Sequence, residues 1–155
     1  MNALVDQQCI DALYRASRAG IKVDLQVRGI CCLKTGITGV SENITVSAIV
    51  GRFLEHARIY YFYNGGNEEV FLGSADLMPR NLDRRVEVLF PIEDPVIKKA
   101  LISTILAVQL KDTMKARMLK SDGTYERKIP EPQQEPVNAQ SWLVQHRGIW
   151  YNASQ

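Results

Sequence analysis

The sequence predicts an α/β protein, because helix-like and strand-like segments follow one another along the chain. The first is a predicted helix over residues 6–20, in which Asp6 is a suitable N-cap, apolar side chains recur at helical spacing and Gly20 can end the helix. Residues 21–29 then alternate apolar and polar side chains, which is typical of a strand with one buried face. A helix that leads directly into such a strand favours layers of helices against a sheet.

Three further strands are predicted in the middle of the chain. Aromatic and β-branched runs over residues 58–63 and 68–75 flank an Asn-Gly-Gly-Asn sequence, which is a strong hairpin signal, and residues 85–92 form the next strand. Residues 33–43 are rich in Gly, Thr and Ser and are expected to form a loop. Residues 44–55 fit either a short helix or an extended segment.

The last part of the chain is predicted to begin with a long amphipathic helix. An Asp-Pro pair at residues 94–95 supplies its N-cap and first helical position, and its apolar face runs to about Lys111. Residues 115–128 are expected to form a small peripheral hairpin. Residues 129–140 form a linker rich in Pro, Gln and Glu, and a short amphipathic tail helix follows over residues 141–150.

The composition narrows the class of protein. With 155 residues, 46% of them hydrophobic and 23% charged, the chain is similar to an ordinary globular domain. The net charge of +2 argues against a protein that coats nucleic acid, and no apolar run approaches the about 18 residues of a membrane span. The start of the chain lacks the layout of a signal peptide. The three cysteines are expected to be free thiols, so we expect a cytoplasmic protein without nucleic-acid or integral membrane partners.

The predicted hairpin places a histidine and an arginine beside a glycine-serine segment. If residues 65–66 form a two-residue turn, Arg58 lies opposite Gly73 and His56 lies opposite Ala75. Residues two apart project from the same face of a strand, so His56 and Arg58 are expected to share a face if the strand extends that far. Local geometry alone therefore gathers these side chains at one end of the hairpin.

The residue types gathered at this end suit the binding of phosphate. An imidazole and a guanidinium lie near the Ser74 hydroxyl and the Asp76 carboxylate. Arg28 stands at the carboxyl end of the strand over residues 21–29, where open α/β sheets place their ligand sites. Arginine neutralises phosphate oxygens, and histidine can donate or accept a proton near neutral pH. Further arginines near this region in the sequence are Arg52, Arg80, Arg84 and Arg85.

Each of these features also has a purely structural explanation. A single histidine in a domain is most often a surface or hydrogen-bonded residue, and arginines most often pair with nearby acidic side chains in solvent. The glycines of the hairpin are turn formers, because a phosphate-binding loop needs a strand before it and a helix after it. The pattern of residue types therefore leaves a phosphate site and a structural role about equally open.

The spacing of these residues resembles a known motif. His-x-Arg, a short hairpin and Gly-Ser-Ala-Asp are similar to the second half-motif of the phospholipase D superfamily, in which Lys, Asp and Asn stand where this chain has Arg58, Tyr63 and Asp76. These differences point to one branch, the bacterial polyphosphate kinases. Segments such as IVGRFLEHARIYYFYNGG and EEVFLGSADLMPRNLDRRVEVLFPIEDP resemble the C-terminal catalytic domain of that family, and the resemblance covers nearly the whole chain. Thr45 is the clear difference, because an arginine is expected there.

The resemblance implies a fold, an activity and a set of ligands. The fold is a phospholipase D-like mixed β-sheet flanked by helices, with a small C-terminal β-hairpin and a tail helix. Residues 1–130 form the catalytic domain, and residues 131–155 form a linker and tail segment of the same domain. The activity is the reversible transfer of the terminal phosphate of ATP to inorganic polyphosphate with Mg²⁺, so ATP, ADP and polyphosphate are the implied ligands. The implied enzyme is a cytoplasmic dimer or tetramer, with any membrane association peripheral.

The resemblance also implies roles for individual residues. His56 is similar to a family histidine that contacts nucleotide phosphates and serves as general acid or base. Arg28 resembles an ATP-phosphate ligand, and Arg85 resembles a further phosphate-binding arginine. The remaining motif positions, also implied to bind phosphate, are Arg58, Ser74 and Asp76. In the family the phosphohistidine nucleophile and the magnesium site belong to a preceding domain, so this chain is expected to hold no metal and to have little or no kinase activity alone.

Two other functions stay open at this point. A phospholipase D-like phosphodiesterase would use His56 on a phosphodiester, although Tyr63 in place of Asp counts against it. A non-catalytic phosphate-binding or oligomerisation module would need no reaction at His56, and in a purely structural module the arginines are surface charge only. Turnover of lipid or nucleic acid would favour the first alternative. Polyphosphate affinity that does not depend on Arg28, His56 and Arg85 would favour the second.

Overall fold

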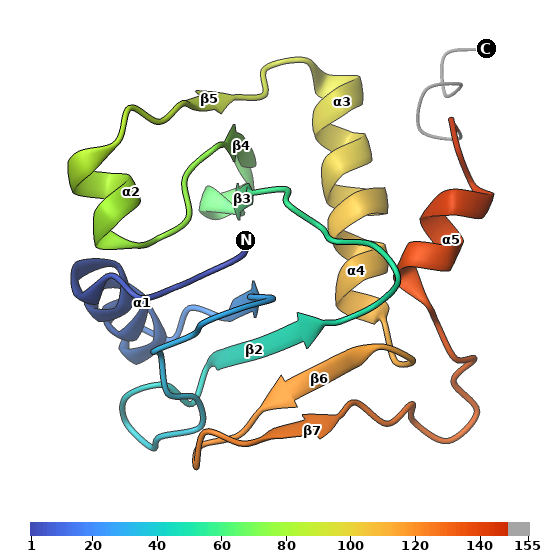
Figure 1. Cartoon of the computed structure of the whole chain (residues 1–155), viewed down its shortest axis with the longest axis horizontal. Coiled ribbons are helices and arrows are strands. Elements are labelled where there is room, and N and C mark those ends of the chain that lie inside the picture. Colours follow the sequence, from blue (N-terminus) through green and yellow to red (C-terminus); the bar gives the residue numbers. More distant parts are fainter. Residues whose placement is uncertain (149–155) are drawn as a thin grey trace.

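The computed structural model describes residues 1–148 and contains two β-sheets (Figure 1). The larger sheet has the strand order β1-β2-β6-β7. Its strands are β1 (Val23–Gln26), β2 (Ile44–Ile49), β6 (Ala116–Leu119) and β7 (Tyr125–Arg127). β1 and β2 are parallel, whereas β6 is antiparallel to both of its neighbours. The predicted α/β class with a mixed sheet is therefore confirmed.

The smaller sheet is antiparallel and has the order β3-β4-β5. Its strands are β3 (Ile59–Phe62), β4 (Glu69–Gly73) and β5 (Leu89–Pro91). The pairing of Ile59 with Leu72 confirms the predicted hairpin register. The predicted two-residue turn is wrong, because a short 3₁₀ helix, η1 (Asn64–Gly66), widens the tip and gives Asn64, Gly65 and Gly66 positive φ angles. The wider tip is centred on the same residues, so the register is unchanged.

The hairpin ladder does not reach His56. β3 begins at Ile59, and beyond it the N–H of Gly73 donates to the carbonyl of Arg58 at 3.2 Å. The expected pairing of His56 with Ala75 is therefore wrong. The Ala75 carbonyl instead accepts a hydrogen bond from the Tyr60 hydroxyl at 2.9 Å.

The helices lie to either side of the sheets in Figure 1, with α1 and α2 on the left and α3, α4 and α5 on the right. They are α1 (Gln7–Arg18), α2 (Pro79–Arg84), α3 (Pro95–Ala100), α4 (Ala107–Lys111) and α5 (Ala139–Gln145). A π-helical segment, η2 (Leu101–Leu106), joins α3 to α4, so the three form the long helix that the sequence predicted. The Asp6 and Asp94 carboxylates cap α1 and α3 as expected, since each accepts backbone N–H bonds from the first turn.

The first five residues form a seam between the two sheets. Toward the larger sheet, the Leu4 N–H donates to the Ile30 carbonyl at 2.9 Å. Toward the smaller sheet, the Val5 N–H donates to the Leu77 carbonyl at 2.8 Å. Leu4 forms bridges on both sides and is fully buried in the main hydrophobic core. The seam, residues 1–5, therefore holds the chain after β1 against the chain after β4.

The structure corrects two other expectations and decides one that the sequence left open. The C-terminal hairpin is not peripheral, because β6 pairs with β2 and so extends the larger sheet. The ambiguous segment over residues 44–55 begins as strand β2, four of whose six residues form a buried run from Val46 to Ile49. The strand predicted over residues 85–92 shortens to β5, because the chain bends at Arg85 and the ladder with β4 begins only at Leu89.

An open apolar hollow lies between the smaller sheet and the long helix. Its volume is about 780 Å³, and its lining is mostly aliphatic and aromatic. The lining includes Ile59, Leu72, Phe90, Ile97, Leu101 and Ile105. The amphipathic face predicted for the long helix is therefore present, but part of it faces this hollow rather than a closed core.

Two predictions from composition can be compared with the described residues. Within residues 1–148, each helix is too short or too polar to cross a lipid bilayer. Cys9, Cys31 and Cys32 are all free thiols, as expected.

The C-terminal helix is anchored to the rest of the fold by a buried carboxylate. Asp112 has no exposed surface and accepts the Ala139 N–H at 2.8 Å through one oxygen. Its other oxygen accepts the N–H groups of Lys115 and Ala116 at 2.6 and 2.9 Å. One side chain thereby fixes the end of α4, the start of β6 and the start of α5 relative to one another.

We expect Asp112→Ala to lower the free energy of unfolding by about 3 kcal/mol or more, because it leaves three backbone N–H groups without their acceptor. Urea unfolding followed by circular dichroism measures this loss. Asp122→Ala is the matched control, since Asp122 is exposed and accepts only local bonds from Thr124, and it should change stability by about 1 kcal/mol at most. Equal effects of the two substitutions would contradict the assigned role of Asp112.

Candidate functional site

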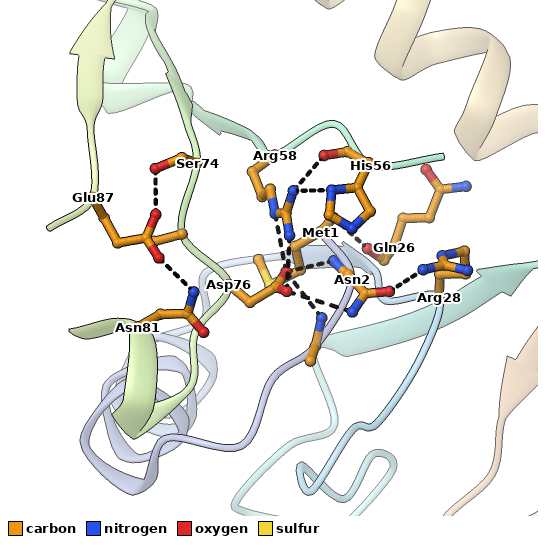
Figure 2. A network of polar contacts seen from close by, with 12 residues as sticks. Met1, Asn2, Gln26, Arg28, His56, Arg58, Ser74, Asp76, Asn81 and Glu87 are labelled. Carbon is orange, nitrogen blue, oxygen red and sulfur yellow. Dashed lines mark hydrogen bonds and ion pairs between the residues drawn. The ribbon is translucent and has the colours of Figure 1, made fainter. Parts of the chain in front are cut away.

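The candidate site lies where three segments meet at the seam. Arg28 follows the carboxyl end of β1, Arg58 immediately precedes β3, and Asp76 follows β4 (Figures 1 and 2). The seam residue Asn2 contacts both Arg28 and Asp76. Residues distant in sequence are therefore brought together by the same contacts that join the two sheets.

Arg58 and Asp76 form a buried ion pair at the centre of this site. The Asp76 carboxylate accepts from Arg58 Nε at 3.2 Å and from Nη2 at 3.0 Å, which is a two-point contact. The exposed fractions are only 9% for Arg58 and 3% for Asp76. Asp76 also accepts the N–H of Asn2 at 2.8 Å and that of Ala3 at 3.2 Å. The pair is therefore hydrogen-bonded on both oxygens, as a buried charge requires.

The surroundings of Asp76 favour its ionised form. Burial acts to raise the pKa of this carboxyl, but the Arg58 guanidinium and the N–H groups of Asn2 and Ala3 outweigh that effect. The pKa of Asp76 is consequently below its ordinary value. Asp76 is thus a fixed anion that orients Arg58, and it is not available as a proton donor near neutral pH.

His56 is held by Arg58 although it lies outside the hairpin ladder. Arg58 Nη1 lies 2.6 Å from His56 Nδ1 and donates to the His56 carbonyl at the same distance (Figure 2). His56 is exposed, whereas Arg58 is buried. The expected shared strand face is not formed, because β3 begins only at Ile59, but the two side chains are brought together by this direct contact.

Arg28 lies on the opposite side of the seam. Arg28 Nη2 donates to Asn2 Oδ1, and Arg28 Nε is buried without a hydrogen-bond partner in the described part of the chain. The Met1 ammonium is buried nearby and donates to the Gln26 carbonyl at 2.9 Å. Arg28 and Arg58 thus approach the Asn2–Asp76 contact from two sides.

Ser74 belongs to a second, separate cluster. Its hydroxyl donates to Glu87 Oε2 and accepts the Val88 N–H at 3.0 Å, while Glu87 Oε1 accepts from Asn81 Nδ2 at 2.6 Å (Figure 2). The bonds from Ser74 and Asn81 lower the pKa of Glu87, and the positive charge of Arg85 adds to this effect. Ser74 therefore faces Glu87 rather than the Arg58–His56 pair. Arg85, an exposed residue directly after α2, lies on this side of the site.

Sequence patterns did not reveal several of these partners. Asn2 binds Arg28, Glu87 binds Ser74, and Asn81 binds Glu87. All three partners fall outside the hairpin motif. Glu87 carried one usable signal, because it is an acidic residue within an extended run directly after two arginines. Asn2 carried none, since its position depends on the insertion of the seam between two sheets.

The family resemblance implies Mg²⁺, and the donor set here does not fit that ion. Within residues 1–148, no three His, Cys, Asp or Glu side chains are grouped so as to hold a metal. Both Asp76 oxygens are committed to Arg58 and backbone N–H groups, and both Glu87 oxygens are committed to Ser74 and Asn81. Mg²⁺ requires about six oxygen ligands in octahedral geometry, which these carboxylates do not offer.

Comparisons with known proteins identify the family. The model of the polyphosphate kinase C-terminal domain 2 matches residues 1–140. The chain belongs to this family. This match confirms the resemblance to the C-terminal domain of polyphosphate kinases that the motifs indicated. The matched range includes the motif residues His56, Arg58, Ser74 and Asp76.

Individual polyphosphate kinases are similar along most of the chain. The polyphosphate kinase of Prosthecochloris aestuarii is 56% identical over 149 residues, which cover 96% of this chain and 20% of that protein. Polyphosphate kinase 1 of Chlorobaculum tepidum is 60% identical over 125 residues, covering 81% of this chain and 18% of that protein. The crystal structure of polyphosphate kinase from Porphyromonas gingivalis matches with a TM-score of 0.89 and 45% identity, covering 94% of this chain and 22% of that one. This polyphosphate kinase domain therefore spans about a fifth of the length of its relatives.

We expect this polyphosphate kinase domain to lose stability as the pH decreases, because Asp76 becomes protonated in acid. Because the pKa of Asp76 is lower in the folded state than the about 3.9 of an unfolded chain, its ionisation stabilises the fold above that pH. The stabilisation is lost as the pH falls below about 4. Asp76→Asn should lower the free energy of unfolding near neutral pH by about 3–5 kcal/mol, because Arg58 is left unpaired, and it should flatten the acid dependence.

Urea unfolding at a series of pH values measures both effects. Asp11→Asn, at an exposed position on α1, is the matched control and should keep the wild-type acid dependence. If Asp76→Asn loses stability with acid as steeply as the wild type, the ionised state of Asp76 does not stabilise the fold.

Proposed function

We propose that this chain supplies the second-histidine half of a polyphosphate kinase active site, which transfers the terminal phosphate of ATP reversibly to inorganic polyphosphate. The observation that supports the proposal most directly is the convergence of His56, Arg58 and Arg28 around the anionic Asp76 at the seam. In this proposal Arg28, His56 and Arg85 bind ATP or polyphosphate. Arg58, Ser74 and Asp76, the other implied phosphate ligands, are instead proposed to hold the geometry of the site, because their polar groups already bond within the chain.

The lining of the adjacent hollow supports this location for the anion. Arg58 borders the hollow, but the rest of the lining is almost entirely apolar, so it cannot replace the hydration of a polyphosphate chain. On the other side of Arg58 lie the exposed His56 ring and, across the seam, Arg28, whose Nε has no hydrogen-bond partner in the described part of the chain. A polyanion is therefore expected along the His56 side of Arg58 and not inside the hollow.

The contact with Arg58 defines the role of His56. Arginine is always protonated and can only donate, so Nδ1 of His56 accepts from Nη1 and the proton of the neutral ring is carried by Nε2. A protonated Nε2 has no lone pair with which to attack phosphorus, but it can donate to a phosphate oxygen or a leaving group. We therefore assign the neutral His56 ring as a hydrogen-bond donor to phosphate, and not as the phosphoryl-accepting nucleophile.

The proposal places the remaining components outside these residues. The phosphohistidine nucleophile lies in the part of a polyphosphate kinase that this chain does not span, which is about four fifths of the length of its relatives. The ligands are ATP, ADP and polyphosphate, and Mg²⁺ is proposed to be bound mainly through the preceding domain and the nucleotide, since no carboxylate set within residues 1–148 fits it. The whole enzyme is proposed to be a cytoplasmic dimer or tetramer, and this chain alone is proposed to have little or no kinase activity.

We expect Arg28→Ala, His56→Ala and Arg85→Ala each to weaken polyphosphate binding by the full 155-residue chain at least about tenfold, since each removes a charge-assisted or N–H donor to phosphate. Isothermal titration calorimetry with polyphosphate measures the affinity. Arg127→Ala is the matched control for the two arginine variants, because Arg127 is exposed on β7 and its loss changes the net charge equally. If all four variants bind like the wild type, the arginines are surface charge and the proposal is wrong.

We expect ¹⁵N NMR of the imidazole rings to report the Nε2–H tautomer for His56 under mildly alkaline conditions, because Arg58 occupies Nδ1 as a donor. The chain has only two histidines, so the signals can be assigned by substitution of one of them. Arg58→Met keeps the length of the side chain and removes the donor, and it should allow both tautomers. Finding the Nδ1–H tautomer in the wild type would contradict the assignment of His56 as a donor.

A further inference from the structure

The segment that carries His56 has almost no regular structure of its own. Between β2 and β3, residues 50–58 have neither helix nor strand, and most of them are exposed. Arg58 contacts His56 from one end of this segment, but that contact does not hold the residues before it. We define residues 50–56 as the His56 loop. Its position must come from contacts with other parts of the fold.

Gln140, on the first turn of α5, binds the backbone of this loop. Its Oε1 accepts the Phe53 N–H at 3.0 Å, and its Nε2 donates to the Phe53 carbonyl at 2.9 Å. The side-chain amide therefore bonds Phe53 on both backbone groups, as a neighbouring strand would. Gln140 is only 6% exposed, so these bonds are shielded from water. In Figure 1 the chain leaving β2 passes the start of α5 before it turns back toward β3.

Glu55, the residue directly before His56, is held from two helices. Its Oε1 accepts from Gln140 Nε2 at 2.8 Å, and its Oε2 accepts from Gln109 Nε2, on α4, at 2.5 Å. Gln109 is 9% exposed, although it lies in an amphipathic helix where an apolar residue would fill the same space. Both amide donors of Gln140 and both oxygens of Glu55 are therefore engaged.

The backbone of the loop is shaped to admit the Gln140 amide. A Cβ atom at Gly51 would lie about 2.4 Å from Gln140 Oε1 and 2.9 Å from its Cδ, so only glycine allows this approach. Gln140 itself is fixed at its backbone, because the preceding residue, Ala139, donates to the buried Asp112. The anchor of α5 and the His56 loop are thus one continuous set of contacts.

We propose that Gln140, together with Gln109, is a positioning residue that sets the place of His56 in the phosphate site. Gln140 and Gln109 hold Phe53 and Glu55 on one side of His56, and Arg58 holds His56 on the other. Neither glutamine contacts the Arg58–Asp76 pair in the described residues. The inference rests on the proposed role of His56 in phosphate binding, but the position of the ring can be measured independently of that role.

The test combines ring NMR with polyphosphate affinity in the full 155-residue chain. We expect Gln140→Ala and Gln109→Ala each to shift the His56 ring signals, because the His56 loop loses one of its attachments. We expect each to weaken polyphosphate binding at least about fivefold, since Gln109 contributes one hydrogen bond to the loop and Gln140 contributes three. The matched control is Gln145→Ala, at an exposed position on the same helix, which should change neither measurement.

His146 reports on whether α5 survives the substitution. Its ring stacks on Trp142 at 4.1 Å between ring centres, so its signals move if the helix is lost. Gln109 binds Glu55 from α4, so Gln109→Ala leaves α5 unchanged. If Gln140→Ala shifts the His146 signals, the Gln109→Ala variant is the one that tests the proposal. Unchanged His56 signals in Gln109→Ala, or in a Gln140→Ala variant with an intact α5, would overturn the proposal.

A double-mutant cycle separates positioning from a general structural effect. If Gln140 acts through His56, Gln140→Ala should have no further effect on polyphosphate affinity in the H56A background. An equal loss of affinity in the presence and absence of the His56 side chain would overturn the proposal. Failure of the wild type to bind polyphosphate would refute the proposed function instead, and the ring signals would still test the positioning.

Discussion

The buried ion pair between Arg58 and Asp76 is the interaction on which the fold and the site both depend. A buried carboxylate is tolerated only where its oxygens are fully hydrogen-bonded, and here the donors come from the hairpin and from the seam. Satisfying Asp76 therefore requires the two sheets to be joined in one specific way. The guanidinium that meets this requirement is also the group that contacts His56, so the stability of the junction and the geometry of the candidate site share one side chain.

The site places its exposed residue on an irregular segment and its fixed residues on the surrounding framework. His56 is exposed and lies outside the strands, whereas the groups around it, Arg58, Gln109 and Gln140, are each buried. Side-chain amides replace the backbone ladder as the means of support. Such an arrangement leaves the histidine accessible to a large polyanion and still restricts where the ring can lie, which is a common division between loops and scaffold in binding sites.

The sequence was sufficient for the local parts of this structure and insufficient for the parts that depend on distant pairing. The helix caps at Asp6 and Asp94 and the register of the β3–β4 hairpin follow from neighbouring residues, so they could be predicted. The pairing of β6 with β2 joins segments about 70 residues apart, and the pattern of the hairpin gives no hint of it. The Arg58–His56 contact was within reach of the hairpin motif, but the orientation of Ser74 toward Glu87 and the reach of Gln140 to Phe53 depend on tertiary packing.

The β3–β4 hairpin has a tip whose length can vary and strands whose register is fixed. The tip residues 63–68 are all exposed and lie beyond the last paired residues, Phe62 and Glu69, so a change in tip length carries only a small entropic cost. A one-residue slip of the strands would turn Arg58 to the other face and away from Asp76. Among homologous chains, insertions and deletions should therefore accumulate at the tip. The number of residues from Ile59 to Phe62 and from Glu69 to Asp76 should stay the same.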